Sequence, residues 1–183
     1  MKIFLHEFGH HYKKYLFGYT LHALREQNDL FNDLFAKGFL PYTGDTAIKN
    51  TYYMARSCRI ELEKFSLSSE NRRIQKKILP GTFIKTKHSP EELINNDHFI
   101  KFCIDYFTNR HGPDIFSKER LQFVLSFSNE VHVIKYANTQ GDAMAYVIET
   151  QGKDAAQYWF SFYDLNALAH VGVPFSIQIN FPP

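Results

Sequence analysis

The sequence has no run of about 18 apolar residues, the length that a transmembrane helix needs. Its first residues, Met1 to Glu7, lack the apolar centre of a secretory signal peptide. Cysteine is scarce, since only Cys58 and Cys103 are present and neither has a CxxC partner. Such usage predicts neither a disulfide framework nor a thiolate metal site. Together these absences predict a cytoplasmic, soluble protein with two free thiols.

Proline and glycine are also sparse, at 7 and 9 of 183 residues, and they fall mostly between periodic segments. We find no internal repeat and no low-complexity tract, so a single domain over residues 1–183 is expected. The net charge is only +2, so a nucleic-acid site would have to be a local basic patch. Aromatic residues are plentiful, with 18 Phe and 11 Tyr. This abundance favours an aromatic core over a ring-lined groove.

The periodicity of apolar residues predicts an α+β (α/β) protein. Helical spacing and capping residues predict helices over 28–38, from Ser68 or Ser69 to about 79, from 89 to 107, and after Ser117. Alternation predicts an extended piece over 39–45 and strands over 52–65, 82–88, 130–137, 142–149 and 157–164. Turns at 138–141 and 151–154 predict that the last three strands form an antiparallel meander. We therefore expect a mixed, largely antiparallel sheet flanked by helices.

One short motif, His6-Glu-Phe-Gly-His10, has the HExxH spacing of zinc peptidases. On a helix, two histidines four residues apart face the same way and can bind zinc, and the glutamate can act as general base. The third ligand is undefined, with His22, Glu26 and Asp29 as candidates by proximity alone. A zinc peptidase is therefore an alternative function, and our preferred interpretation includes no metal.

A second motif is the basic segment from Ser68 to Lys77. Arg72, Arg73, Lys76 and Lys77 recur at helical spacing and would form one basic face of a helix. Free N–H groups at the start of that helix, together with Ser68 and Ser69, suit an anion such as phosphate. Arg56 and Arg59 precede the helix and add cations near its start, although a solvated basic face is the simpler interpretation.

The segment Tyr53 to Arg73 reads Tyr-x-Ala-Arg-Ser-x-Arg, then a phenylalanine, a serine pair and Glu-Asn-Arg-Arg. It resembles the arginyl- and leucyl-tRNA–protein transferases, in which an arginine-bearing strand precedes a serine pair and a basic helix. Further similarity to bacterial members of this group lies in the segments 16–20 and 38–44, and in the aromatic strand 158–164 that ends in Tyr-Asp.

This resemblance implies an acetyltransferase-like (GNAT-like) fold that transfers an amino acid from a charged tRNA to the N-terminal amine of a protein. It implies that the tRNA or its 3′ end contacts the basic segment, and the residues concerned are Arg56, Arg59, Ser68, Ser69, Asn71, Arg72, Arg73, Lys76 and Lys77. It also implies that Tyr163 and Asp164 line the reaction cleft. Tyr163 would donate to the developing oxyanion and Asp164 would orient or deprotonate the amine, unless Asp164 is a helix N-cap.

In that family the pattern continues beyond the part that this sequence matches, with another helix and the last strands. We expect one of two cases. Either a second copy of the chain completes the fold in a homo-oligomer, or the protein is a shortened and inactive member of the family. The acyl-CoA loop of ordinary acetyltransferases is absent after Asp164, so no cofactor is expected. A non-catalytic binding module is the third alternative. A splayed pair of strands around Met144 to Asp164 would be informative about the GNAT-like fold.

Overall fold

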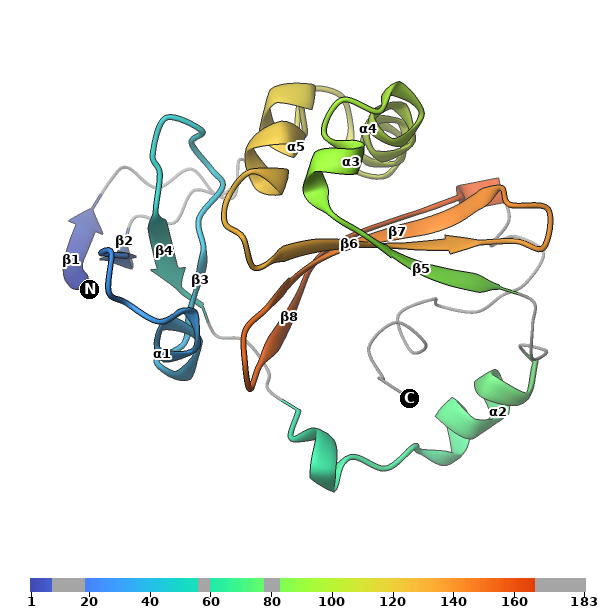
Figure 1. The fold of residues 1–183 in the computed structure, drawn as a ribbon, viewed down its shortest axis with the longest axis horizontal. Coiled ribbons are helices and arrows are strands. Elements are labelled where there is room, and N and C mark those ends of the chain that lie inside the picture. Colours follow the sequence, from blue (N-terminus) through green and yellow to red (C-terminus); the bar gives the residue numbers. More distant parts are fainter. Residues whose placement is uncertain (8–18, 56–59, 78–82, 167–183) are drawn as a thin grey trace. The chain divides into compact units, whose positions relative to one another are not determined.

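The computed structural model describes residues 1–7, 19–55, 60–77 and 83–166 (Figure 1). The chain forms two compact units, Met1–Arg59 with Gly152–Ala155, and Ile60–Gln151 with Ala156–Pro183. Each unit has a four-stranded antiparallel sheet and at least one helix, which confirms the predicted α+β class. The single domain over residues 1–183 stays a prediction, because two compact units can belong to one folding domain.

The sheet of the second unit confirms the predicted meander. Its strands follow one another in the order of the sequence: β5 (Ile84–His88), β6 (Val131–Ala137), β7 (Ala143–Gln151) and β8 (Ala156–Tyr163). Three helices connect β5 to β6: α3 (Pro90–Leu93), α4 (Asp97–His111) and α5 (Lys118–Leu125). These helices lie on one side of the sheet (Figure 1). The aromatic-core interpretation holds here, because the buried residues between helices and sheet include Phe99, Tyr146 and Phe162.

The helices begin where side chains can cap them. Asn96 accepts a hydrogen bond from the backbone N–H of Phe99 at 3.0 Å, and Ser117 accepts one from Arg120 at 3.2 Å. Such caps satisfy N–H groups that have no partner within the helix. The single helix expected over 89–107 is wrong, because the chain ends α3 at Leu93 and starts α4 anew after Asn96.

Strands β7 and β8 stay paired along their length, from Ala145 opposite Tyr163 to Gln151 opposite Ala156. The splayed pair that would mark a GNAT-like fold is therefore absent from these two strands. The ladder contains one irregularity, since Phe160 pairs with Ile148 but Tyr158 pairs with Glu149. The residue between them, Trp159, has no opposite partner and forms a β-bulge.

The first unit contains a sheet that the sequence did not predict in full. Its order is β1 (Lys2–Glu7), β2 (Tyr19–Leu24), β4 (Thr51–Met54) and β3 (Phe39–Pro41), and α1 covers Phe31–Ala36. The helix expected over 28–38 and the extended piece after it are thus confirmed with shorter bounds. Gly38 ends the helical region with φ of 87°, a conformation that favours glycine.

The strand expected over 52–65 is too long. β4 ends at Met54, residues 56–59 lie outside the described part, and Leu62–Lys64 form a short 3-10 helix, η2. Lys64 and Glu61 form an exposed ion pair across this short helix. Alternation of residue types alone therefore overestimated the strand, because charged residues on both faces satisfy the pattern without burial.

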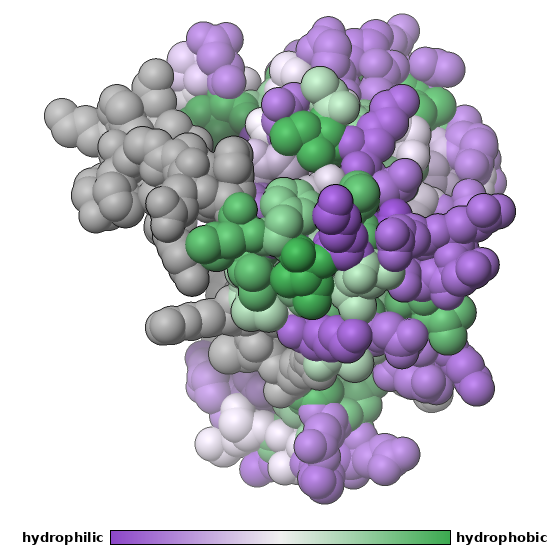
Figure 2. All heavy atoms as spheres, turned by 90° about the vertical axis from the view of Figure 1, so that its left-hand side faces the viewer, coloured by the Kyte–Doolittle hydropathy of each residue, from purple (hydrophilic) through white to green (hydrophobic). Residues whose placement is uncertain are grey.

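Aromatic packing also builds the first unit. The rings of Phe31 and Phe35 have centroids 4.1 Å apart, and Phe31 packs edge-on against Tyr52. His22 is buried between Phe4, which stacks on it at 5.5 Å, and Tyr42, which meets it edge-on. Apolar side chains of this unit also reach the surface, and Figure 2 shows such an exposed apolar area on the side where β1 lies. They include Ile3, Phe4 and Leu5 of β1.

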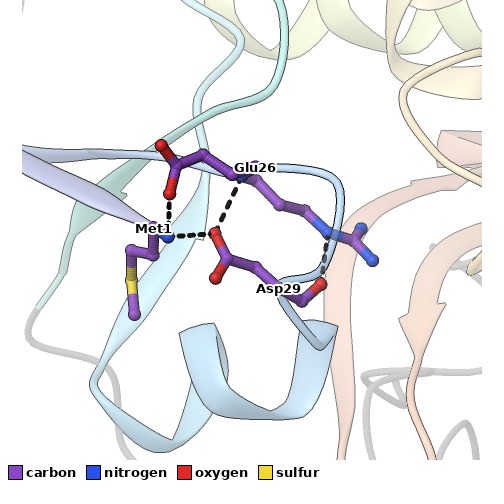
Figure 3. Close-up of polar contacts among 4 residues, drawn as sticks. Met1, Glu26 and Asp29 are labelled. Atoms are coloured by element: carbon purple, nitrogen blue, oxygen red, sulfur yellow. Dashed lines mark hydrogen bonds and ion pairs between the residues drawn. The ribbon is translucent and has the colours of Figure 1, made fainter.

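The amine of Met1 is held by two carboxylates. It lies 2.5 Å from Oε2 of Glu26 and 2.5 Å from Oδ2 of Asp29 (Figure 3). The same Asp29 oxygen accepts a hydrogen bond from the backbone N–H of Glu26 at 2.8 Å. Hydrogen bonds to Asp29 and Glu26 raise the pKa of the amine, and the bond with the amine lowers the pKa of Asp29. These contacts join the start of β1 to the turn after β2.

No helix in the described ranges combines the length and the apolar character that crossing a membrane requires. Cys103 is a free, buried cysteine of α4, and burial raises the pKa of its thiol well above the ordinary value. Its thiol is therefore protonated and unreactive at neutral pH. Cys58 lies outside the described residues.

Leu121 has no exposed surface, whereas Leu62 in η2 is 54% exposed, so the pair tests the core of the second unit. We expect Leu121→Ala to lower the free energy of unfolding by about 2–5 kcal/mol, because it removes buried methyl groups and leaves a cavity. Leu62→Ala should change it by about 0.5 kcal/mol or less. Urea denaturation followed by circular dichroism measures both. Equal effects of the two substitutions would contradict this placement of the core.

The Met1 amine contacts predict a pH dependence of stability with two limbs. Asp29 has a lowered pKa in the folded chain, so its contribution is present above its unfolded pKa and is lost as pH falls through the folded value. The amine has a raised pKa, so its contribution is present below its unfolded pKa and is lost as pH rises through the folded value. Thermal unfolding across pH measures both limbs. Asp29→Asn should flatten the acidic limb of this profile, and N-terminal acetylation should flatten the alkaline limb. If both altered proteins keep the original profile, the Met1 amine contacts do not contribute to stability.

Candidate functional site

The basic segment forms a capped helix, as predicted. α2 covers Ser69–Lys77, and Ser68 accepts a hydrogen bond from the backbone N–H of Asn71 at 3.1 Å. Ser68 is therefore the N-cap, and Ser69 is the first residue of the helix. The helix carries four cationic residues against one carboxylate, Glu70. The N-terminal end is the positive end of the helix dipole, so both features favour an anion.

Two of the cations already have partners within the segment. Arg73 forms two hydrogen bonds to Glu70, from Nε at 2.7 Å and from Nη2 at 2.5 Å. This pairing raises the pKa of the Arg73 guanidinium. Arg72 donates from Nη1 to the carbonyl oxygen of Leu67 at 2.5 Å. Both are exposed, and the third cation, Lys76, is exposed as well.

Exposed ion pairs contribute little to stability and exchange readily with solvent. Glu70 can therefore give up Arg73 to a phosphate, which has more acceptor oxygens in the geometry that a guanidinium prefers. The predicted contacts at Arg56 and Arg59 lie outside the described residues. Lys77 is the last residue of α2, and only its backbone is described.

Tyr163 is the last residue of β8 and lies partly buried beside helix α4. Its ring meets that of Tyr106 edge-on, with centroids 4.7 Å apart. Burial and a hydrogen bond with Tyr163 raise the pKa of Tyr106. The phenol O–H of Tyr163 can donate a hydrogen bond, as the predicted donor role requires.

Asp164 follows β8 and caps the turn after it. Its backbone N–H donates to the carbonyl oxygen of Met144 at 2.9 Å, and its Oδ1 accepts from the backbone N–H of Asn166 at 2.8 Å. This is the geometry of a helix N-cap, the alternative that the sequence left open for Asp164. One oxygen of the carboxylate is engaged in the cap, and the second forms no hydrogen bond with the described residues.

The HExxH motif does not begin on a helix. His6 and Glu7 are the last residues of strand β1, and His10 lies outside the described residues. The zinc-binding hypothesis needs the motif to be helical, so that its histidines face the same way. On a strand, neighbouring side chains alternate between faces, so His6 and Glu7 do not meet that condition. The three candidate third ligands have other roles: His22 packs between rings, and Glu26 and Asp29 hold the Met1 amine. Within the described ranges, no group of three or more metal-ligating side chains comes together.

The sequence did not point to a polar group on the second sheet. Glu149 of β7 lies opposite His132 of β6 and opposite Tyr158 of β8. From β5, Lys87 reaches over to Gln151 of β7, with Nζ 3.0 Å from Oε1. These residues are far apart in the sequence, and only the strand register brings them into one row. No local motif could have identified them.

Comparison with known proteins identifies no family for this chain. No protein-family model matches the sequence. No curated protein matches it either.

Proposed function

We propose that this protein transfers an amino acid from an aminoacyl-tRNA to the N-terminal amine of another protein. The observation that carries the proposal is the capped basic helix α2, whose first residues belong to the segment that resembles aminoacyl-tRNA–protein transferases. The positive end of the α2 dipole and the exposed arginines fit a phosphate or the 3′ end of a tRNA. Tyr163 and Asp164, at the end of β8, are the proposed reaction residues.

The proposed reaction requires little covalent help from the protein. The amino acid is already activated as an ester of the tRNA 3′ oxygen, so positioning and oxyanion stabilisation suffice. The neutral amine attacks the ester carbonyl carbon, the new C–N bond forms, and the C–O bond to the tRNA breaks. Tyr163 donates a hydrogen bond to the developing oxyanion, and the leaving 3′ oxygen takes the proton that the attacking amine loses. The second oxygen of Asp164 can orient the amine.

A non-catalytic tRNA-binding module is a second candidate. The hydrogen bond from Asn166 favours it, because this bond gives Asp164 a structural role that needs no chemistry. The basic helix α2 would serve either function equally well. Only transfer of a labelled amino acid separates the two candidates.

We also propose the setting in which this function operates. An aminoacyl-tRNA substrate fits a protein of the cytoplasm, and the reaction as written needs no cofactor. A homo-oligomer is part of the proposal, because a second copy could complete a sheet. Among the described strands, none pairs with the outer edge of β8, and an open sheet edge is a template for another strand.

The proposed tRNA contacts predict a change in the salt dependence of binding. We expect Arg72→Ala/Arg73→Ala to weaken tRNA binding and to reduce the slope of log K against log salt by about 0.7–0.9 for each phosphate that the variant no longer neutralises. Fluorescence anisotropy with labelled tRNA at several salt concentrations measures both quantities. The matched control is Lys101→Ala/Lys118→Ala, which removes two lysines paired with Asp105 and Asp97 on other helices. Equal losses in the two double variants would reduce α2 to a solvated basic face.

The proposed transfer predicts a specific role for the Tyr163 hydroxyl. Tyr163→Phe should slow transfer from charged tRNA to a peptide by about 10²-fold, the usual effect of losing one oxyanion donor. Tyr146→Phe, which removes a hydroxyl from the core, is the control and should leave the rate nearly unchanged. Asp164→Asn keeps a capping oxygen, so a loss of transfer without unfolding would assign chemistry to the carboxylate. Failure of the unaltered protein with every aminoacyl-tRNA, while tRNA still binds, would favour the binding module.

A further inference from the structure

Three polar side chains are joined by hydrogen bonds where strand β5 leads into helix α3. Oγ1 of Thr86 lies 3.1 Å from Nε2 of His88, and Nδ1 of the same imidazole lies 2.8 Å from Oε2 of Glu92. A hydroxyl, an imidazole and a carboxylate in this order form a catalytic triad, in which the carboxylate orients the ring and the ring activates the hydroxyl. We call these three residues the Thr-His-Glu triad.

The backbone brings the members of the triad together. Thr86 and His88 are two residues apart on β5, so both side chains lie on the same face of the strand. Across the ladder they lie opposite Lys135 and Val133, and Val133 belongs to the core that packs against the helices. The triad thus lies on the helix side of the sheet. Helix α3 starts two residues after β5, and Glu92 is its third residue, one helical turn beyond His88.

The charge of Glu92 determines which nitrogen of His88 carries the proton. Hydrogen bonds from His88 and from the backbone of Ser89 lower the pKa of Glu92, so this side chain is an ionised carboxylate at neutral pH. An ionised carboxylate only accepts hydrogen bonds, and Nδ1 of His88 is therefore the donor. In the neutral ring, Nε2 then accepts the hydrogen bond that the Thr86 hydroxyl donates. The hydroxyl proton thus points at a base.

The triad is accessible, and a cation lies beside it. Thr86 is exposed because β5 lies at the edge of the described sheet, and the His88 side chain is 28% exposed. Lys135 lies directly opposite Thr86, where the Cβ atoms of such a pair are about 4.5–5.5 Å apart. Its ammonium uses one of three N–H donors on the carbonyl oxygen of Gly141, at 3.2 Å. A positive charge at this position stabilises an oxyanion that forms next to Thr86.

We propose that the Thr-His-Glu triad hydrolyses small activated carboxylic esters through an acyl group on Thr86. First, Oγ1 of Thr86 attacks the ester carbonyl carbon and its proton passes to Nε2 of His88. The C–O bond to the alcohol breaks, and His88 returns the proton to the leaving oxygen. Water then attacks the new ester on Thr86, and its proton passes through Nε2 of His88 to Oγ1. The products are a carboxylic acid and an alcohol, and the hydroxyl of Thr86 is restored.

This site is separate from the proposed centre of aminoacyl transfer. Tyr163 is the last residue of β8, and β8 and β5 are the two outer strands in the order of this sheet. With a spacing of about 4.8 Å between neighbouring strands, the two outer strands lie about 14 Å apart. Ester hydrolysis at Thr86 therefore needs neither tRNA nor an acceptor protein, and it can be measured on a protein that transfers no amino acid.

Hydrolysis of p-nitrophenyl acetate tests this site, with the rate measured from the absorbance of p-nitrophenolate. We expect Thr86→Val to lower the rate by at least about 10-fold, because the imidazole loses the hydroxyl that it activates. Valine has a similar shape and favours strands, so β5 should persist. Thr86→Ser should keep most of the activity. Glu92→Gln should also lower the rate by about 10-fold or more, whereas Glu91→Gln, the matched change on α3, should leave it unchanged.

The acyl group itself gives a second measurement on the unaltered protein. Because p-nitrophenolate leaves more readily than a threonine alkoxide, the second step is slower and acetyl-Thr86 should accumulate. Mass spectrometry of peptic peptides from acid-quenched protein locates the acetyl group. Hydroxylamine should remove it from Thr86, where it is an ester, but would not remove an amide from Lys85 or Lys87.

Two results would overturn the triad as an acyl-transfer site. Equal rates for the unaltered protein and Thr86→Val would show that an exposed imidazole hydrolyses the ester without the hydroxyl. Acid-quenched unaltered protein without a hydroxylamine-sensitive acetyl group on Thr86 would exclude the covalent step, even where a variant fails to fold. Neither result bears on aminoacyl transfer, which is measured with charged tRNA.

Discussion

The burial of one sheet face beneath α4 and α5 is the constraint on which the rest of the second unit depends. Alternate residues of β6, β7 and β8 have almost no exposed surface there, and they meet an apolar stripe of α4 that includes Phe99 and Cys103. Apolar burial is non-directional, but a sheet has a period of two. Packing one face against the helices therefore also sets which side chains lie on the opposite face, among them Tyr136 and Tyr158.

The difference between the two sheet faces explains why polar side chains gather on the face that α4 and α5 do not cover. The helix-covered face holds aromatic and aliphatic side chains, and its aromatic rings pack edge-on, as Phe99 and Tyr146 do at 4.8 Å. On the opposite face Glu149, His132 and Lys87 occupy positions of neighbouring strands. The pKa shifts of Glu149 and His132 arise chiefly from burial, which the packing of the sheet imposes on them. These two pKa shifts thus depend on the fold and not on a local sequence motif.

The sequence predicted the parts of the fold that depend on local signals. Capping residues such as Ser68 and Ser117, and the alternation over 130–164, located helices and strands correctly. Strands β1 and β2 were missed, because His6 and Glu7 resembled a helical metal motif and a strand of a separate sheet has no local signature. The role of Asp164 as a cap was foreseen as an alternative. Glu149 could not be found, because its neighbours are defined by register between distant segments.

The bulge at Trp159 also bears on how such a chain tolerates changes in length. Removing Trp159 would restore an even ladder with Tyr158 still opposite Glu149 and Phe160 still opposite Ile148, because Trp159 is the residue without a partner. The molecule would lose only the indole that packs edge-on against Phe127. Removing one residue on the amino side of the bulge would instead leave the strand one position short at its start. Length variation among descendants of this sequence would therefore be expected to collect at Trp159, where the remaining side chains of β8 keep their faces of the sheet.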